Sequence, residues 1–196
     1  MRITDLLDKR SISLDAAPVD KKATLDMAVE LMAKSGKLMD VEQYRAQVYA
    51  REEESTTGIG EGIAIPHGKC DAVKTPGLAA MVIKNGVDYD SLDGEPVTLL
   101  FLIAAPNTKD NVHLDVLSKL SVMLMDENFT TSLRNAKSVE EFLQIIDAAD
   151  ESAKSIDDRL SDTGITTEEK KSFKLLAVTS CPVSYTHLRA HETAAN

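Results

Sequence analysis

The stretch Gly58-Ile-Gly-Glu-Gly62-Ile-Ala-Ile-Pro66-His67-Gly-Lys-Cys70 decides how the rest of the chain is interpreted. Glycines at every second position lose much entropy on folding and have no side chain to pack, so we expect a loop at Gly58–Gly62 rather than a strand. They also tolerate positive φ and the close approach of another backbone, which suits an anion or a partner surface. Residues 63–65 predict a short strand, and Pro66 restricts the chain just before His67. The imidazole is thus held either as a nucleophile or proton carrier, or as an ordinary loop histidine.

Helical and strand patterns alternate around this stretch. Residues 22–34 carry apolar side chains at helical spacing, and Asp40 with Gln43 predicts a capping box that begins a helix with Arg51 in its last turn. The apolar runs 78–83 and 97–105 predict strands that are buried on both faces, and residues 84–87 and 93–96 predict turns between them. Amphipathic helices are expected over 116–124 and from Ser138 to 149. This order predicts an α/β architecture in which helices cover a mostly buried sheet.

Composition excludes several classes of function. The chain has 196 residues, 43% of them hydrophobic, and a formal net charge of −10, which disfavours nucleic acid or an anionic membrane as a partner. The longest apolar run, 97–105, is too short to span a membrane, and the first residues lack the apolar core of a signal peptide. Cys70 and Cys181 do not make a disulfide scaffold. We therefore expect a cytoplasmic protein.

The composition changes near residue 149, where we place the end of a single main domain, 1–149. Residues 150–172 are rich in acids and predict a solvated linker, the first part of a poorly ordered extension. Residues 173–182 predict a short apolar strand that ends at Cys181. Residues 183–196 show no apolar period of either kind.

Three side chains are candidates for one site. His113 begins the amphipathic helix on its buried side, where it either bonds a carbonyl in the core or faces His67. Arg51 is either a solvated helix end or a third donor around one anion, and each charge-assisted bond is worth about 1.5–3 kcal/mol. Two metal sets can also be drawn, but neither has the spacing of a structural zinc pair. They are His67, Cys70, Asp71 and His113, and Cys181, His187 and His191. We expect no metal.

Residues 1–149 resemble the enzyme IIA domain of the fructose/mannitol family of the phosphoenolpyruvate-dependent sugar phosphotransferase system. Three segments carry the resemblance, namely Arg51-Glu52, Ser55-Thr-Thr-Gly-Ile-Gly-Glu-Gly-Ile-Ala-Ile-Pro-His-Gly68 and Asn111-Val-His113-Leu-x-x-Leu117-x-x-Leu120. The resemblance implies a mixed sheet flanked by helices on both faces. It implies that His67 is the phosphorylated residue and that His113 and Arg51 orient or stabilise the phosphoryl group. Glu61 lies inside the motif, and its role is left open. No cofactor is implied.

The end of the chain resembles the start of a fructose-type IIB domain, in which Cys181 would be the phosphocysteine. Residues 183–196 depart from that family abruptly, as a foreign peptide would, so we expect a truncated IIB start and no working acceptor at Cys181. The resemblance implies that HPr donates the phosphoryl group, that a IIB domain accepts it, and that the membrane is met only through a IIC part missing from this chain. A regulatory, nitrogen-related IIA protein is the alternative, and a metal hydrolase is a third class.

Overall fold

The computed structural model describes residues 2–108 and 112–162, and the side chains of 2–108 and 116–151. A short 3-10 helix, η1 (Ile3–Asp5), precedes the elements in the order β1 (Leu7–Ser13), α1 (Lys21–Lys34), α2 (Val41–Glu54), β2 (Gly58–Gly60), β3 (Ile63–Ala64), β4 (His67–Cys70), β5 (Gly77–Val87), β6 (Val97–Pro106), α3 (Val112–Leu124), α4 (Glu127–Asn135) and α5 (Val139–Asp162).

The strands form one mixed sheet in the order β1-β5-β6-β3-β2, and β4 also pairs with β6. The central pair β5 and β6 is antiparallel, whereas β3 and β4 run parallel to β6, one after the other along its length. Ile63 lies opposite Leu99, and His67 lies opposite Ile103. Pairing with β6 therefore fixes the register of both β3 and β4, and so the position of His67 along the sheet.

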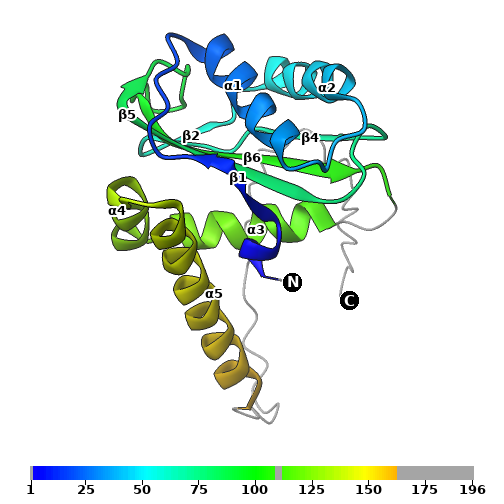
Figure 1. Cartoon of the computed structure of the whole chain (residues 1–196). Coiled ribbons are helices and arrows are strands. Elements are labelled where there is room, and N and C mark those ends of the chain that lie inside the picture. The colour runs from blue at the N-terminus through cyan, green and yellow to red at the C-terminus, as the bar shows by residue number, and fades with distance from the viewer. Residues whose placement is uncertain (1, 109–111, 163–196) are drawn as a thin grey trace, which may run out of the picture. The chain divides into compact units, whose positions relative to one another are not determined.

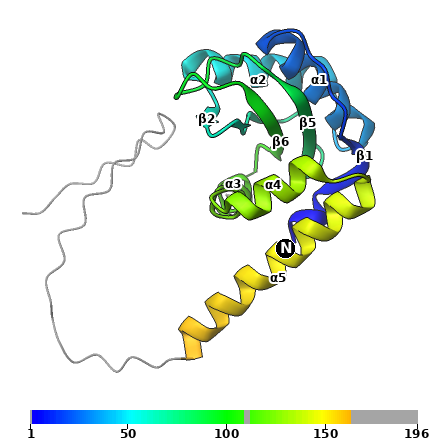
Figure 2. The ribbon, with the colours of Figure 1, turned by 90° about the vertical axis from the view of Figure 1, so that its left-hand side faces the viewer.

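Helices cover both faces of the sheet, which confirms the predicted architecture (Figure 1). α1 and α2 pack on one face, against Leu100 and Leu102 of β6. α3, α4 and α5 pack on the other face, against residues such as Phe101, whose ring lies 6.2 Å from that of Phe142. Successive side chains of a strand point to opposite faces, so the continuous apolar run of β6 is buried on both sides, as predicted. Figure 2 shows the two helical layers edge-on.

The helix start predicted at Asp40 is confirmed, because the Asp40 side chain accepts a hydrogen bond from the amide of Gln43 (2.9 Å). The structure adds a cap that was not predicted, at Asp20, whose side chain accepts a hydrogen bond from the amide of Ala23 (2.7 Å). Such caps satisfy amides that have no partner inside the helix. The Asp40 cap matters for the site, because it sets where α2 begins and hence where its last turn places Arg51.

Two predictions about loops are wrong. Gly58–Gly60 is a strand, β2, which pairs antiparallel with β3. Gly58 lies so close to Ser91 that a Cβ there would meet the Ser91 hydroxyl oxygen at 2.6 Å, so only glycine fits. Close packing with a neighbouring segment here outweighs the poor strand propensity of glycine. Residues 84–87, predicted as a turn, continue β5 through an irregularity in its pairing with β6, where Gly86 adopts φ +67°. An Asn-Gly pair suits such a bulge as well as a turn.

α5 continues to Asp162, past the boundary predicted at 149. Asp150 is buried, accepts a hydrogen bond from the amide of Ile3 (3.4 Å) and pairs with Lys119, so residue 150 packs with the main domain. The proposed linker beyond 162, the strand 173–182 with Cys181, and the tail 183–196 lie outside the described residues and stay predictions. Within residues 2–108 and 112–162, no helix is both long and apolar enough to cross a membrane.

Candidate functional site

His67 lies at the start of β4, directly beneath α2. A Cβ at Gly68 would lie 2.9 Å from the Tyr44 ring and 3.1 Å from Val48, so only glycine lets the helix rest on the strand. The Tyr44 hydroxyl donates to the carbonyl oxygen of Ile103, the β6 residue opposite His67 (2.9 Å). Arg51 follows Val48 by three residues, so its side chain lies on the same face of α2 as that of Val48. The close packing at Gly68 thus brings Arg51 to His67.

The two ring nitrogens of His67 have different partners. Nδ1 lies 3.1 Å from the carbonyl oxygen of Ile65, which can only accept, so Nδ1 carries the proton. Nε2 accepts a hydrogen bond from Nε of Arg51 (3.1 Å), which can only donate. Both contacts select the same neutral tautomer, in which the lone pair of Nε2 points at the guanidinium. Nε2 is therefore the ring nitrogen that carries the available lone pair.

Arg51 is itself held by the loop that follows α2. Its Nη1 donates to the carbonyl oxygen and to the hydroxyl of Ser55, at 3.1 and 3.2 Å. Nη2 of Arg51 donates to no residue in the part of the chain whose side chains the structure describes. The guanidinium of Arg51 is half-buried, held by His67 and Ser55, and keeps N–H groups that these bonds do not use. Such a group can donate to the oxygens of a phosphate placed at Nε2 of His67.

The surroundings of His67 lower its pKa. Partial burial is the main cause, since it disfavours the charged ring, and the nearby charge of Arg51 acts in the same direction. The Ile65 carbonyl and the carboxylates of Glu52 and Glu54 oppose the shift only in part. The ring is therefore neutral at pH 7, the state in which Nε2 can attack a phosphorus atom.

A buried carboxylate supports the frame of the site. Glu52 accepts hydrogen bonds from the amide (3.0 Å) and hydroxyl (2.5 Å) of Thr57 and pairs with Lys21 (2.9 Å). The carbonyl of Thr57 in turn accepts from the amide of Ile65 (3.0 Å), whose own carbonyl orients His67. A chain of hydrogen bonds thus runs from Glu52 through the backbones of Thr57 and Ile65 to Nδ1 of His67.

The structure places Glu61 away from His67. Ile63 and His67 lie opposite β6 residues that are four positions apart, about 13 Å along a strand, and Glu61 precedes Ile63. Glu61 has φ +55°, its amide donates to Asp93 (2.7 Å), and its carbonyl accepts from Arg134 (2.7 Å). These contacts give it a role in the β2–β3 turn. The amide of Gly58 likewise donates within the protein, to Thr56 (3.2 Å), so it is not held open for an anion.

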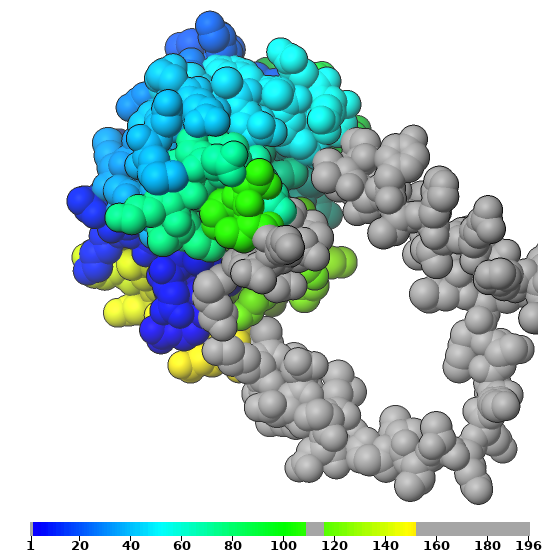
Figure 3. Space-filling model, turned by 90° about the vertical axis from the view of Figure 1, so that its right-hand side faces the viewer, coloured from blue at the N-terminus to red at the C-terminus, as the bar shows by residue number. Residues whose placement is uncertain are grey.

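His113 lies in the first turn of α3, and its side chain is outside the described part of the chain. The other end of α3, at Ser121 and Leu124, lines a hollow together with Ile63. Ile63 pairs with an earlier part of β6 than His67 does. Since the last turn of α3 lies beside Ile63, its first turn lies toward the end of the sheet that holds His67. Figure 3 shows a face on which cyan residues near 50 and green residues near 105 both reach the surface.

Cys70 ends β4 as a buried, free thiol whose pKa is raised, chiefly by burial. It is therefore protonated at neutral pH and is a poor metal ligand. In the part of the chain whose side chains are described, no group of three or more His, Cys, Asp or Glu residues is arranged to hold a metal ion.

Sequence reasoning singled out Arg51 and His67, which the structure brings into contact. It missed the partners that orient them, namely Glu52, Ser55, Thr57 and the carbonyl of Ile65. The signal available for Glu52 and Thr57 was a charged and a hydroxyl residue beside the motif, which does not reveal burial. A backbone carbonyl leaves no signal in the sequence at all.

Comparison with known proteins identifies relatives of this arrangement. Residues 5–149 match the family described as "Phosphoenolpyruvate-dependent sugar phosphotransferase system, EIIA 2". The chain is 41% identical over 187 residues to the "PTS system fructose-specific EIIABC component" of Bacillus subtilis. That match covers 95% of this chain but only 29% of the length of the relative.

Solved structures have the same fold. A nitrogen regulatory protein IIA-Ntr from Neisseria meningitidis matches with a TM-score of 0.69 and 32% identity, over 74% of this chain and 98% of the other. The complex of enzyme IIA and phosphorylated enzyme IIB for mannitol from Escherichia coli matches with a TM-score of 0.64 and 26% identity, over 73% of this chain and 99% of the other.

Proposed function

Because the chain belongs to the type 2 EIIA family of the phosphoenolpyruvate-dependent sugar phosphotransferase system, we propose that it carries a phosphoryl group on Nε2 of His67. The observation that carries this proposal is the pair of contacts on the imidazole. The Ile65 carbonyl holds the proton on Nδ1, and the Arg51 guanidinium lies at the lone pair of Nε2. That pairing prepares one nitrogen for attack and places a cation where the phosphate charge will arrive.

The transfer step needs no metal and no base on this chain. Nε2 attacks the phosphorus of a phosphohistidine on HPr, the new Nε2–P bond forms, and the donor N–P bond breaks with its electron pair returning to the donor ring. No proton leaves His67, since Nε2 carries none. Arg51 exchanges its bond to Nε2 for bonds to phosphoryl oxygens. Positioning and charge stabilisation supply the catalysis, as in other phosphoryl transfers.

In the second step a cysteine thiolate of a IIB domain attacks the same phosphorus. The S–P bond forms, the Nε2–P bond breaks, and the electron pair returns to Nε2, which restores the starting tautomer. The solved complex of a related IIA with a phosphorylated IIB supports an acceptor of this kind. The fructose-specific name of the Bacillus subtilis relative supports fructose as the sugar of the whole system.

His113 remains a proposed member of the site. Its place in the first turn of α3, at the end of the sheet that holds His67, supports a role as a donor to the phosphoryl oxygens. Replacing His113 by alanine is expected to slow phosphorylation of His67 while leaving the melting temperature within about 2 °C of the wild type, a shift below about 1 kcal/mol for a domain of this size. An unchanged rate would return His113 to a structural role.

A regulatory protein is the second candidate, favoured by the 32% identity to the nitrogen regulatory structure. Such a protein would accept phosphate on the same atom and use it as a signal. The two functions differ in the next step, because a carrier passes its phosphoryl group to a IIB cysteine. Loss of label from the phosphorylated chain on addition of a fructose-type IIB domain supports the carrier, and retention of the label supports the regulator.

The test of the proposal is phosphorylation by purified phosphoenolpyruvate, enzyme I and HPr. The intact chain should gain one phosphoryl group that is stable in base and lost in acid, and phosphorus NMR should place it on Nε2. The variant His67→Ala should gain none, whereas the control His191→Ala should gain one. Label that withstands acid, or label on His67→Ala, would contradict the proposal.

A further inference from the structure

Exposed apolar side chains gather at the hollow beside the last turn of α3, which Leu124 lines. Among the residues whose side chains the structure describes, six large apolar side chains are exposed, and three of them line this hollow, namely Ile59, Leu92 and Met125. Leu92 is 75% exposed and Met125 is 79% exposed. The three come from β2, from the connection between β5 and β6, and from the end of α3, so the fold brings them together. A cluster of this kind is typical of a surface that contacts another protein.

The charges around this hollow are mainly negative. Glu61 and Asp93 line it, and two further acids, Asp126 and Glu127, lie at the start of α4. The Asp93 carboxylate accepts hydrogen bonds from the amides of Glu61 (2.7 Å) and Glu95 (3.0 Å), and these bonds lower its pKa. Asp93 is therefore ionised at neutral pH, and the amides that it accepts from carry no net charge to offset its own.

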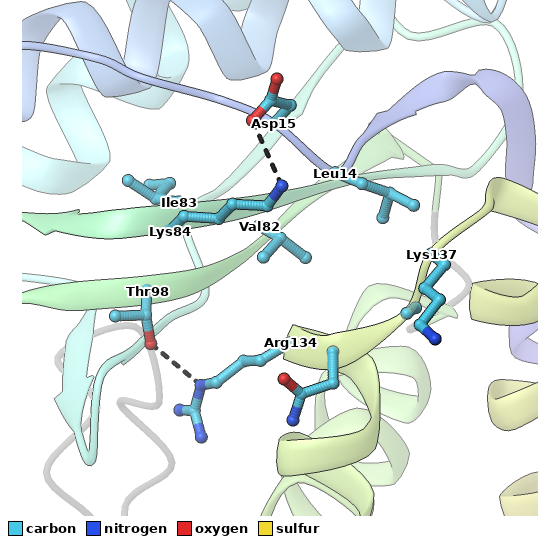
Figure 4. Close-up of a pocket in the computed structure, with 10 residues that line it drawn as sticks. Leu14, Asp15, Val82, Ile83, Lys84, Thr98, Arg134 and Lys137 are labelled. Carbon is cyan, nitrogen blue, oxygen red and sulfur yellow. Dashed lines mark hydrogen bonds and ion pairs between the residues drawn. The ribbon is translucent and has the colours of Figure 1, made fainter.

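Arg134 offsets part of this negative charge. Its Nη2 donates to the Glu61 carbonyl (2.7 Å), and its Nε donates to the Thr98 hydroxyl (2.9 Å), the bond drawn in Figure 4. Burial lowers the pKa of Arg134 and the charge of Glu61 opposes that shift, so these two charges interact. Lys119 of α3 pairs instead with the buried Asp150. One cation thus acts on one of the four acids, and the surroundings of the hollow stay acidic.

The hollow lies within reach of any protein that docks on His67. β3, beside the hollow, and β4, which begins at His67, follow one another along the same side of β6. Ile63 lines the hollow, and its position on β6 is about 13 Å from that of His67. A stable complex buries about 800 Å² of each partner, which corresponds to a disc of about 16 Å radius. A protein that brings a phosphorus atom to Nε2 of His67 therefore also reaches the hollow.

We propose that this hollow is a docking point for the phosphoryl donor. An apolar side chain of the donor lies against Ile59, Leu92 and Met125, and lysine or arginine residues beside it face Asp93 and the acids at the start of α4. This proposal rests on the proposed function. A donor fits this surface because it has to be captured from solution for every transfer, and opposite charges speed such an encounter. The surface contacts no reacting atom, so it acts on capture of the donor and not on the transfer step.

The test is the rate of phosphorylation of His67 at varied concentrations of phospho-HPr. In the double variant Leu92→Ser, Met125→Ser, KM for phospho-HPr should rise at least about tenfold, because full burial of one such side chain already accounts for that factor. The value of kcat should stay within about twofold of the wild type, since the lost contacts are the same before and during transfer. In the wild type, KM should also rise when NaCl is raised from about 50 to about 300 mM, because salt screens exposed charges.

A matched control separates the place of the change from its kind. Met125→Ser alone should raise KM at least about threefold, whereas Met39→Ser, at a methionine that is 67% exposed and precedes the first turn of α2, should leave it unchanged. Arg51 lies in the last turn of that helix, so Met39 is far from the docking point. Because both methionines are exposed, neither variant should melt more than about 2 °C from the wild type.

The outcomes separate this proposal from the proposed function. If the wild-type chain gains no phosphoryl group on His67, the function fails and the docking proposal fails with it. If His67 is phosphorylated but the double variant keeps the KM of the wild type, the docking proposal alone is wrong. Weaker self-association of that variant in sedimentation would then assign the hollow to a second copy of the chain, and slower transfer to a IIB domain would assign it to the acceptor. An equal rise of KM in Met39→Ser and Met125→Ser, or a KM that does not change with salt, would also contradict the proposal.

Discussion

Replacing Glu52 by glutamine tests the frame that holds the imidazole. The Glu52 side chain is only 5% exposed, and its carboxylate accepts two hydrogen bonds from Thr57 and pairs with Lys21. Glutamine keeps the shape but not the charge. Each charge-assisted bond that becomes neutral loses about 1 kcal/mol, and the partly exposed pair with Lys21 adds about 1 kcal/mol more. The free energy of unfolding should therefore fall by about 3 kcal/mol.

For a domain of this size, about 3 kcal/mol corresponds to a fall of about 6–12 °C in the melting temperature, which calorimetry measures directly. The matched control is Glu53→Gln, the same change at the next residue of α2, where the side chain is exposed. That variant should melt within about 2 °C of the wild type.

The same variant should also transfer phosphate more slowly. Thr57 loses its anchor, and its carbonyl positions the backbone of Ile65 that orients His67. A displacement of a few tenths of an ångström at the nucleophile should slow phosphorylation by phospho-HPr about three- to tenfold. If Glu52→Gln and Glu53→Gln shared one melting temperature and one transfer rate, the assigned role of the buried carboxylate would be wrong.

Other consequences concern the backbone, one buried hydroxyl and one pKa. Gly62→Ala should lower the free energy of unfolding, measured in urea, by about 3 kcal/mol, because φ is +72° and the new Cβ would lie 3.3 Å from the Pro96 carbonyl oxygen. Gly36→Ala has nearly the same φ, +73°, but open space around the new Cβ, so it should lose only about 1 kcal/mol. Equal losses would refute the role of the contact at Gly62. Tyr44→Phe removes a buried hydrogen bond to a backbone carbonyl and should cost about 0.5–1.5 kcal/mol, against less than about 0.5 kcal/mol for Tyr49→Phe, whose hydrogen bond is exposed. The reverse order would contradict this ranking. The pKa of His67, followed by NMR, should lie below the ordinary value of about 6.5. The free energy of unfolding should therefore fall as the pH drops below about 6.5, because the unfolded chain takes up the proton before the folded chain does. A pKa at or above the ordinary value would show that burial does not dominate.

Much of the fold follows from the sequence because its signals are local. The cap at Asp40 acts through near neighbours, and the apolar run of β6 is buried on both faces; both predictions are confirmed. The strand at Gly58–Gly60 was not predicted, since glycine has poor strand propensity and neither its pairing with β3 nor the approach of Ser91 is visible in the sequence. β1 was also missed, because only its pairing with β5 makes residues 7–13 a strand.

The site divides in the same way. His67 and Arg51 stand out by residue type and by the motif around them, so sequence reasoning could select them. Which ring nitrogen carries the proton depends on the carbonyl of Ile65 and on the direction from which Arg51 approaches, and neither can be inferred from residue types. The role of Glu61 was left open because its position inside the motif does not define one, and its backbone contacts place it in the β2–β3 turn.

The most direct test of the account is the position of the phosphoryl group after incubation with phosphoenolpyruvate, enzyme I and HPr. Correlation spectroscopy of the phosphorylated chain should show phosphorus coupled to Nε2 of His67, with the proton still on Nδ1. Coupling to Nδ1, or to any other residue, would contradict it.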